Sequence, residues 1–321
     1  MGDATPREPV LTVRIKAISW ETERIRSLEL RDIDGQALPP FTAGAHIDLH
    51  LPNGMVRSYS LMNSPQERHR YLIGVLHTNP SRGGSRCVHE ELQLGDTIHI
   101  SAPRNAFPLD EQAKHSVLIA GGIGLTPLMS MVKRLAQLQR SWQLYYCARS
   151  RAQAPFVHEL ESYGERVELV FDDERGGNLL DLASIIAAAP DGSDFYCCGP
   201  AGMLEAFQSA AASLPPQRRH IEYFAPPPAG PTPTGFTVEL ARSGKTVNIA
   251  AGQTILAAVR DAGIDVPYSC EQGLCGTCET RVLAGVPDHR DHILGDAERA
   301  SNTTMMICCS GSHSDRLVLD L

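Results

Sequence analysis

The sequence predicts a multidomain protein of class β, α/β and α+β: an antiparallel β-barrel, then a parallel α/β domain, then a small C-terminal domain. Three observations support this order. Short β-rich runs separated by turn residues fill the first third of the chain, strand-like and helical stretches alternate in the middle, and a cysteine-rich segment follows a proline-rich stretch. The predicted boundaries are residues 1–110, 111–225, 226–235 for a linker, and 236–321.

The bulk composition excludes several classes of protein. The 321 residues are enough for two or three domains with cores of their own. A net charge of −8 argues against nucleic acid as a partner, because phosphate binding needs a clustered basic surface. No apolar run approaches the ~18–20 residues that span a bilayer, so no membrane contact is expected. The N-terminal sequence lacks the apolar core of a secretory signal, and we expect a cytoplasmic protein.

The first domain is expected to be a barrel because runs such as VLTVRI, HIDLHL, RYLIGVL and DTIHI lie between about Leu11 and Ile100, separated by Gly, Pro and Asn. From Ser116 the pattern changes. A strand, VLIA, leads through a glycine-rich turn into a helix that begins near Leu128. Three further strand-like runs, QLYYC, VELVF and DFYCC, alternate with helical stretches, which predicts a parallel sheet.

The last third begins with a linker. Five prolines within Ala225–Gly235 exclude a helix or a central strand. Beyond it we expect two strands (FTVEL and KTVNIA), an amphipathic helix (TILAAVRDAGI), a cysteine-rich loop and a final strand (RLVLDL). The chain has nine cysteines, and in a reducing compartment regular spacing among them indicates metal or redox chemistry rather than disulfides.

Four cysteines carry the strongest signal in the sequence. Their spacing, C-x4-C-x2-C-x29-C, is that of the four thiolates that ligate both irons of a plant-type [2Fe–2S] cluster. Gly273 and Gly276 allow the loop to fold tightly and to aim backbone N–H groups at sulfur. The alternatives are four structural cysteines or a zinc site, which usually pairs two C-x2-C units. The predicted ligands are Cys270, Cys275, Cys278 and Cys308.

Residues 236–321 therefore resemble a plant-type ferredoxin, which implies a β-grasp fold. Cys309 adjoins the fourth ligand and is easily mistaken for it. In the family, the last ligand is the cysteine of a C-x-S pattern, which Cys308, Cys309 and Ser310 match. The resemblance thus implies Cys308 as the ligand.

A second motif, RSYSL, ends an expected barrel strand, and SRGGSR follows about twenty residues later. An arginine can pair with a flavin phosphate, a tyrosine ring can cover the isoalloxazine, and a neighbouring serine can hydrogen-bond its N5. Glycine N–H groups and a serine hydroxyl could complete the phosphate site. The alternative, a strand-end arginine and a plain turn, would be favoured if the motif stood alone. The flavin candidates are Arg57, Ser58, Tyr59, Ser60, Gly83, Gly84 and Ser85.

A third motif, AGGIGLTP, links a strand to a helix, where free N–H groups and the helix dipole favour a pyrophosphate. Thr126 is the expected N-cap and Pro127 the first helical residue. Pro127 also replaces the third glycine of G-x-G-x-x-G, which counts against an ordinary Rossmann dehydrogenase. A fourth motif, CGPxxM, follows the strand DFYCC. The nicotinamide candidates are Gly121, Gly122, Gly124, Thr126, Pro127, Cys198, Gly199, Pro200 and Met203.

These motifs resemble the ferredoxin–NADP reductase superfamily, whose nucleotide motif is GGxGxTP, and the domain order resembles the phthalate dioxygenase reductase family over nearly the whole chain. The resemblance implies FMN rather than FAD, and NADH as the donor. It also implies that Cys198 lies near the position of hydride transfer and that Glu222 and Phe224 return beside the flavin ring. The expected catalytic residues are Ser60, Cys198 and Phe224.

Some residues have a second interpretation. Arg149 and Ser150 lie just past the second strand of the middle domain, where a basic residue could accept the 2′-phosphate of NADPH. We keep NADH, because the family prefers it and a single arginine is often only solvated. His289 and His292 have metal-compatible spacing, but no further ligand pattern accompanies them, so we expect a polar surface loop. The expected packing cysteines are Cys87, Cys147 and Cys197.

The three sites together predict one route for electrons. A flavin accepts a hydride and returns electrons one at a time, whereas a [2Fe–2S] cluster carries one. The resemblance implies that the protein partner is a Rieske-type terminal oxygenase, a dioxygenase or O-demethylase, that acts on small, often aromatic molecules. The alternatives are a reductase for a cytochrome P450 or another monooxygenase, and a redox carrier or sensor with a vestigial flavin domain.

Overall fold

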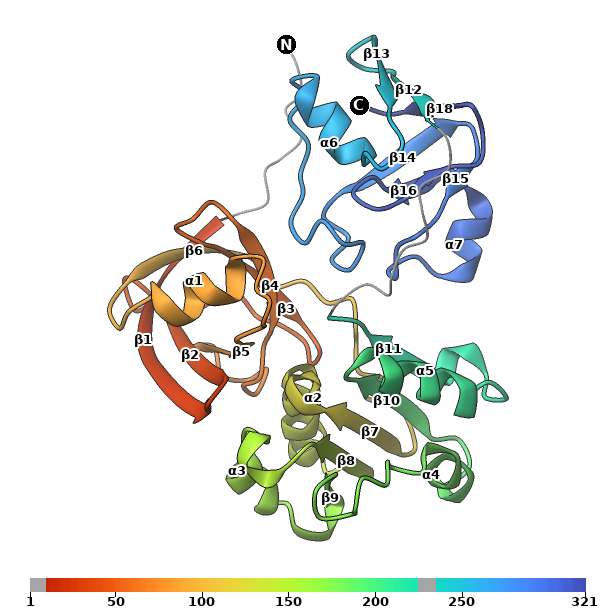
Figure 1. The fold of residues 1–321 in the computed structure, drawn as a ribbon. Helices are drawn as coiled ribbons and strands as arrows, with labels where there is room; N and C mark the ends of the chain where they lie inside the picture. The colour runs from red at the N-terminus through yellow and green to blue at the C-terminus, as the bar shows by residue number, and fades with distance from the viewer. Residues whose placement is uncertain (1–9, 225–234) are drawn as a thin grey trace. The chain divides into compact units, whose positions relative to one another are not determined.

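The computed structural model describes residues 10–224 and 235–321 (Figure 1). They fall into two compact units, the first ending at Phe224 and the second containing the cysteine-rich domain. The predicted linker, 226–235, lies outside the described residues except for Gly235. Within the described ranges, no helix is both long and apolar enough to cross a membrane.

Six antiparallel strands form the first sheet, in the order β4-β3-β6-β1-β2-β5. A backbone bridge between Leu61, directly after β4, and Ile73 in β5 brings the two ends of this order together, as the predicted barrel requires. One helix, α1, packs Cys87 and Val88 into the barrel core. The elements are β1 Val10–Thr22, β2 Ile25–Asp32, β3 His46–His50, β4 Val56–Ser60, β5 Tyr71–Leu76, α1 Gly84–Glu90 and β6 Thr97–Ser101.

Five parallel strands form the second sheet of this unit, in the order β11-β10-β7-β8-β9. Separate apolar clusters cover its two faces, with α2 and α3 on one side and α4 and α5 on the other (Figure 1). The strands are β7 Ser116–Gly121, β8 Trp142–Ala148, β9 Val167–Phe171, β10 Asp194–Cys198 and β11 Arg219–Glu222. The helices are α2 Leu125–Gln137, α3 Val157–Glu161, α4 Leu182–Ala188 and α5 Ala201–Ala210, and short 3₁₀ turns span Gly122–Gly124, Arg151–Gln153, Gly164–Arg166 and Pro216–Arg218.

The strand order reverses direction at β7, because the chain proceeds from β7 to β8 and β9 on one side and then returns to β10 on the other. Ligands of such sheets bind at the carboxyl ends of the strands beside this reversal. The predicted nicotinamide motifs follow β7 and β10, the two strands that meet there. The topology therefore supports a nucleotide site at this edge.

The N-terminus of α2 corrects one prediction. The N-cap is Gly124, and α2 begins at Leu125, so Thr126 lies inside the helix and is not its cap. The reason is that Gly122–Gly124 already form a 3₁₀ turn that leads directly into the helix. The Thr126 hydroxyl instead donates to the Ile123 carbonyl oxygen at 3.0 Å.

The second unit is a five-stranded sheet of order β13-β12-β18-β14-β16 with α6 packed on it through Ile255 and Val259. The central pair, β12 and β18, is parallel, and their neighbours are antiparallel, as the predicted β-grasp fold requires. Thr254 caps α6 by accepting the Ala257 N–H. The elements are β12 Phe236–Leu240, β13 Lys245–Ile249, α6 Ile255–Asp261, β14 Glu279–Ala284, β15 Pro287–Asp288, α7 Asp296–Ser301, β16 Thr304–Met306, β17 Gly311–Ser312 and β18 Arg316–Leu319.

Candidate functional site

The four predicted cluster ligands lie together in the second unit. Cys270 Sγ is within hydrogen-bonding contact of the thiols of Cys275 and Cys308, and Cys278 contacts Cys308 in the same way. The hydrogen bonds from Cys275 and Cys308 lower the pKa of the Cys270 thiol. The same hydrogen bonds raise the pKa of the Cys275 and Cys308 thiols, so these contacts establish that the sulfurs lie together and not that all four are thiolates.

The loop between Cys270 and Cys278 turns its backbone toward these sulfurs. The N–H groups of Gln272 and Leu274 donate to Cys270 Sγ at 3.3 and 3.4 Å. The Gly273 N–H donates to Cys308 Sγ at 3.2 Å. Such N–H···S bonds are the interactions that stabilise and tune iron–sulfur centres. The thiols and the backbone donors therefore fit a [2Fe–2S] cluster.

Two glycines make this loop possible. Gly273 and Gly276 have φ angles of +70° and +78°, in the left-handed region that favours glycine. At Gly273 a Cβ would also lie 2.5 Å from Cys309 Sγ, so no side chain fits there. Cys309 is thus the packing neighbour of the loop, which favours Cys308 as the fourth ligand.

Among residues 10–224 and 235–321, no three His, Cys, Asp or Glu side chains are placed to hold one metal ion. Four thiolates that share two irons need not converge on one point. None of the nine cysteines, all of which are described, forms a disulfide. Cys87, Cys147 and Cys197 are buried, as predicted.

The segment that carries His289 and His292 differs from its prediction, because it is not a surface loop. The side chain of His289 is only 9% exposed, and that of Asp291 is fully buried. The His292 N–H donates to the Gly273 carbonyl oxygen at 2.9 Å, so the segment packs directly on the cysteine loop. Its spacing in the sequence gave no sign of this contact.

The two nicotinamide motifs interlock at the carboxyl ends of β7 and β10. A Cβ on Gly124 would lie 2.2 Å from the Cys198 carbonyl oxygen, and one on Gly121 would lie 2.6 Å from Cδ of Pro200. Gly124 therefore allows the backbones of the two motifs to pack together, and Gly121 leaves room for the Pro200 ring. Gly122 differs, since its φ is +55° and the space beside it is open. Of these three glycines, Gly122 is the one with room for a ligand beside it.

Thr126, Pro127 and Met203 have packing roles in the structure. Thr126 and Pro127 are buried in α2, and the Thr126 methyl group lies against Gly74 of the barrel strand β5. Met203 Sδ covers Gly121 and Gly199, where a Cβ would lie 2.9 and 2.7 Å away. Thr126 therefore helps join the barrel to the parallel sheet within the first unit.

A thiol and a carboxyl group lie side by side at this edge. Cys198 and Glu222 are paired across the parallel strands β10 and β11. Burial raises the pKa of the Cys198 thiol, and the Glu222 carboxyl adds to this shift. Burial also raises the pKa of Glu222 to about 8, and its Oε2 has no hydrogen-bond partner among the described residues. Strongly shifted groups at a strand edge are typical of functional sites. Phe224 follows two residues later and is 41% exposed.

The flavin motif brings its arginine to the predicted phosphate turn. The Arg57 side chain lies over Gly84, where a Cβ would be 2.7 Å from Arg57 Cγ. Gly83 has a φ of +107°, and its N–H donates to Ser81 Oγ at 3.1 Å. Ser85 Oγ lies 2.9 Å from Thr78 Oγ1 in the same turn. The structure thus brings together the two segments that the sequence paired.

The other residues of RSYSL alternate between two faces of β4. Tyr59 packs against the barrel core, and burial raises the pKa of its hydroxyl. Ser58 faces the opposite side, where its hydroxyl donates to Asp48 Oδ1 at 2.6 Å. Asp48 is also ion-paired with Arg104 at 2.5 Å. Ser58 is therefore engaged in the barrel, and Ser60, at the strand end, is 5% exposed.

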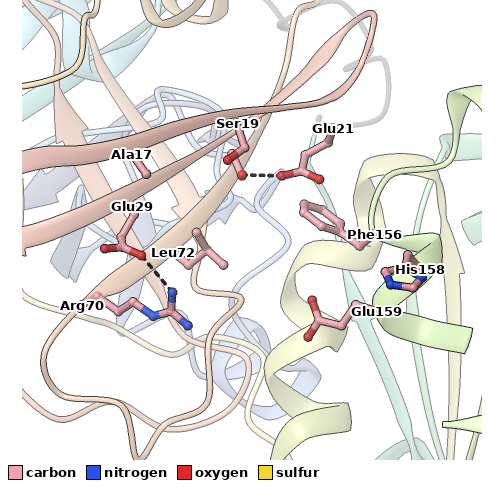
Figure 2. A pocket seen from close by; sticks show the side chains of 10 residues that line it. Ala17, Ser19, Glu21, Glu29, Arg70, Leu72, Phe156, His158 and Glu159 are labelled. Atoms are coloured by element: carbon pink, nitrogen blue, oxygen red, sulfur yellow. Dashed lines mark hydrogen bonds and ion pairs between the residues drawn. The ribbon is translucent and has the colours of Figure 1, made fainter. Parts of the chain in front are cut away.

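A separate pocket of about 340 Å³ lies between the outside of the barrel and α3 (Figure 2). Glu29 and Arg70 pair on the barrel side at 2.8 Å, and Phe156 projects from the start of α3. None of its lining residues belongs to the flavin, nicotinamide or cysteine motifs. The pocket is therefore distinct from the candidate sites.

A flavin-type barrel, a parallel sheet with a nucleotide turn and a ferredoxin-type cysteine loop define an electron-transfer oxidoreductase. Comparison with known proteins agrees. Residues 118–209 match the oxidoreductase NAD-binding domain family, and residues 238–311 match the 2Fe-2S iron-sulfur cluster binding domain family. The phenoxybenzoate dioxygenase subunit beta of Ectopseudomonas oleovorans is 55% identical over 321 residues, 100% of both chains. The phthalate dioxygenase reductase of Burkholderia cepacia is 40% identical, with 99% of each chain covered.

Solved structures agree with these relatives. A phthalate dioxygenase reductase, described as a modular structure for electron transfer from pyridine nucleotides to [2Fe–2S], matches with a TM-score of 0.75 and 38% identity over 97% of this chain and 98% of that one. An intact type IV self-sufficient cytochrome P450 monooxygenase matches with a TM-score of 0.88 and 40% identity, covering 97% of this chain and 41% of that chain. The chain belongs to the phthalate dioxygenase reductase family. It is an NADH-dependent flavin iron–sulfur oxidoreductase with FMN and a [2Fe–2S] cluster as cofactors.

The packing of Gly124 can be tested by adding a single methyl group. Gly124→Ala would place Cβ 2.2 Å from the Cys198 carbonyl oxygen, so the backbone must shift. We expect a loss of about 1–3 kcal/mol in stability and slower flavin reduction by NADH. Gly202→Ala is the matched control, because nothing lies within 4 Å of its Cβ on α5. Denaturant unfolding and stopped-flow absorbance measure the two effects, and equal behaviour of the two variants would contradict the interlock.

The raised pKa of Glu222 predicts a dependence of stability on pH. The folded protein keeps a proton up to about pH 8, whereas the unfolded chain releases it near the ordinary value of 4.5. Stability from this group is therefore fully present below about pH 4.5 and is lost as the pH rises through about 8. The Glu222→Gln variant has no such proton to release, so its stability should not fall over this pH range. Thermal midpoints of both proteins between pH 4.5 and 8.5 measure it, and parallel profiles would show that Glu222 is not desolvated.

Proposed function

We propose that this chain is the reductase component of a Rieske-type oxygenase system. In this proposal it takes electrons from NADH and delivers them singly to a terminal oxygenase, a dioxygenase or O-demethylase, that acts on small, often aromatic molecules. The observation that carries the proposal is that the flavin, nicotinamide and cysteine motifs of this one chain each bring their own residues together. Support also comes from full-length similarity to proteins named as parts of dioxygenase systems.

The flavin site uses residues of β4 and of the turn before α1. FMN, when bound, accepts a hydride and releases electrons singly, which allows a two-electron donor to supply a one-electron centre. Arg57 would supply a charge-assisted contact to the phosphate, beside the turn at Gly83 and Gly84. Tyr59 and Ser60 would contact the ring. The adjacency of Arg57 and Gly84 supports this arrangement.

The nicotinamide site lies where β7 and β10 end. Gly122, with open space beside it, offers its backbone to the pyrophosphate. Cys198 and Glu222 are both desolvated, so both hold their protons at neutral pH. Their neutral groups would exclude water and orient the nicotinamide ring without adding a charge.

The surroundings of Arg149 agree with NADH as the coenzyme. Arg149 is exposed at the end of β8, and its carbonyl oxygen accepts the Asp173 N–H at 3.1 Å. Asp173 therefore lies directly beside Arg149, and Asp172, the first residue after β9, lies beside Ala148. Their negative charges would oppose the 2′-phosphate of NADPH. These neighbours support the interpretation that Arg149 is a solvated residue and not a ligand of a 2′-phosphate.

The electron route ends at the cluster in the second unit, from which electrons pass to the oxygenase. Its proposed ligands are Cys270, Cys275, Cys278 and Cys308. We propose a cytoplasmic location with neither nucleic acid nor membrane as a partner. The net charge of −8 and the requirement for reduced thiols support this proposal.

A second candidate partner is a cytochrome P450. The similarity to the self-sufficient P450 monooxygenase, of which this chain covers 41%, favours it specifically. Purified reductase can be offered either a Rieske oxygenase or a P450, with NADH-driven substrate turnover as the measurement. Turnover with the P450 alone would replace the proposed partner.

The cluster ligands can be tested by Cys278→Ser. We expect loss of the visible and EPR signature of the [2Fe–2S] centre and of NADH-driven oxygenase turnover. Reduction of ferricyanide by NADH should continue, because the flavin and nicotinamide sites lie in the other unit. Cys309→Ser is the control and should keep the cluster. A normal signature in the Cys278 variant would remove this cysteine from the ligand set.

The phosphate contact can be tested by Arg57→Ala. Removing a charge-assisted hydrogen bond costs about 1.5–3 kcal/mol, so FMN affinity should fall roughly ten-fold or more. Flavin retention after dialysis and a fluorescence titration with FMN measure it. Arg24→Ala is the control, because Arg24 is a barrel arginine outside the flavin motif whose guanidinium donates to the His77 carbonyl oxygen. Unchanged affinity would place the phosphate elsewhere.

A further inference from the structure

We propose that Asp291 is a positioning residue for the iron–sulfur centre. Its carboxylate would hold the turn of residues 291–294 against the cysteine loop, so that the Gly273 N–H faces Cys308 Sγ. The inference rests on the ligand set of the proposed function.

The carboxylate organises its own turn. Asp291 Oδ2 accepts the N–H groups of Ile293 at 3.1 Å and of Leu294 at 2.8 Å. Leu294 is buried in the core of the second unit, and Ile293 packs against that core. The turn is therefore fixed at one end by hydrogen bonds to the carboxylate and at the other by apolar packing.

This turn contacts both glycines of the cysteine loop. The Asp291 Cα lies 3.0 Å from where a Cβ of Gly273 would be, and Ile293 Cγ2 lies 3.9 Å from the equivalent position of Gly276. The His292 N–H donates to the Gly273 carbonyl oxygen at 2.9 Å. The same Gly273 residue donates its own N–H to Cys308 Sγ at 3.2 Å. Hydrogen bonds and backbone thus connect the Asp291 carboxylate to Cys308, a proposed cluster ligand.

The burial of Asp291 requires a reason. A carboxylate with no exposed surface is costly unless donors compensate it. Two backbone N–H groups and the Arg299 guanidinium, 3.7 Å away, supply that compensation for Oδ2. Oδ1 makes no hydrogen bond among the described residues and lies 3.8 Å from His289 Nδ1. The Arg299 guanidinium also donates to the Asp291 backbone carbonyl oxygen. Holding the turn is a function that accounts for these interactions.

The consequence for electron transfer follows from the N–H···S bond. A hydrogen bond to a ligand sulfur stabilises the extra negative charge of the reduced cluster and so raises its reduction potential. If the turn loosens, the Gly273 peptide can rotate and this bond weakens. The midpoint potential of the cluster should then fall.

The test compares two uncharged variants of the full chain, Asp291→Asn and Asp291→Ala. Both remove the negative charge, but only asparagine keeps an oxygen that accepts the Ile293 and Leu294 N–H groups. We expect a lower midpoint potential and altered EPR g values in the alanine variant relative to the asparagine variant. Redox titration followed by EPR and by visible absorbance measures both. Asp288→Asn is the control for charge on the same segment, since Asp288 pairs with Arg290 and does not cap the turn.

Equal potentials and g values in the two variants would overturn the proposal, as would loss of the cluster from both. Loss from the alanine variant alone would support it. If that variant unfolds the second unit, Asp291→Ser takes its place. Its hydroxyl lies one bond closer to the backbone and is a weaker acceptor for this turn, so we expect a smaller but measurable fall in potential relative to the asparagine variant. Absence of the centre from the unmodified protein would instead contradict the ligand set.

Discussion

Close approach at positions where no Cβ fits underlies all three sites. Gly124 allows its turn to meet the Cys198 carbonyl, Gly84 lies beneath the Arg57 side chain, and Gly273 lies against Cys309. In each case two segments far apart in the sequence meet at a glycine. At Gly124 the neighbour is backbone, whereas at Gly84 and Gly273 the nearest neighbour is a side chain. The sites therefore depend on close packing at glycine as well as on the chemistry of their polar residues.

The order of strands then decides which motifs meet. Because β7 is central, the turns after β7 and β10 are neighbours, although 77 residues separate Gly121 from Cys198. The contact between Thr126 and Gly74 fixes the same helix start to the barrel that carries the flavin motif. The nicotinamide turn is thus anchored both to its sheet and to the neighbouring barrel.

Much of this arrangement was predictable, because spacing and turn chemistry are local. The cysteine spacing, the strand that ends in RSYSL and the glycine turn after β7 each depend on a few adjacent residues. The errors arose where tertiary packing decides. Thr126 has the chemistry of an N-cap, but the preceding 3₁₀ turn takes that position for Gly124. The segment around His289 is polar in sequence, yet it is buried because it packs on Gly273.

The two buried carboxyl groups show why residue type alone could not reveal their roles. Glu222 Oε2 has no hydrogen-bond partner in the described ranges, so desolvation raises its pKa to about 8 and favours the neutral acid. Asp291 Oδ2 accepts two backbone N–H groups and lies 3.7 Å from the Arg299 guanidinium. One group is suited to lie beside a hydride path without adding charge, and the other to fix a turn. The two carboxyl groups differ because folding places backbone N–H donors beside Asp291 Oδ2 and none beside Glu222 Oε2.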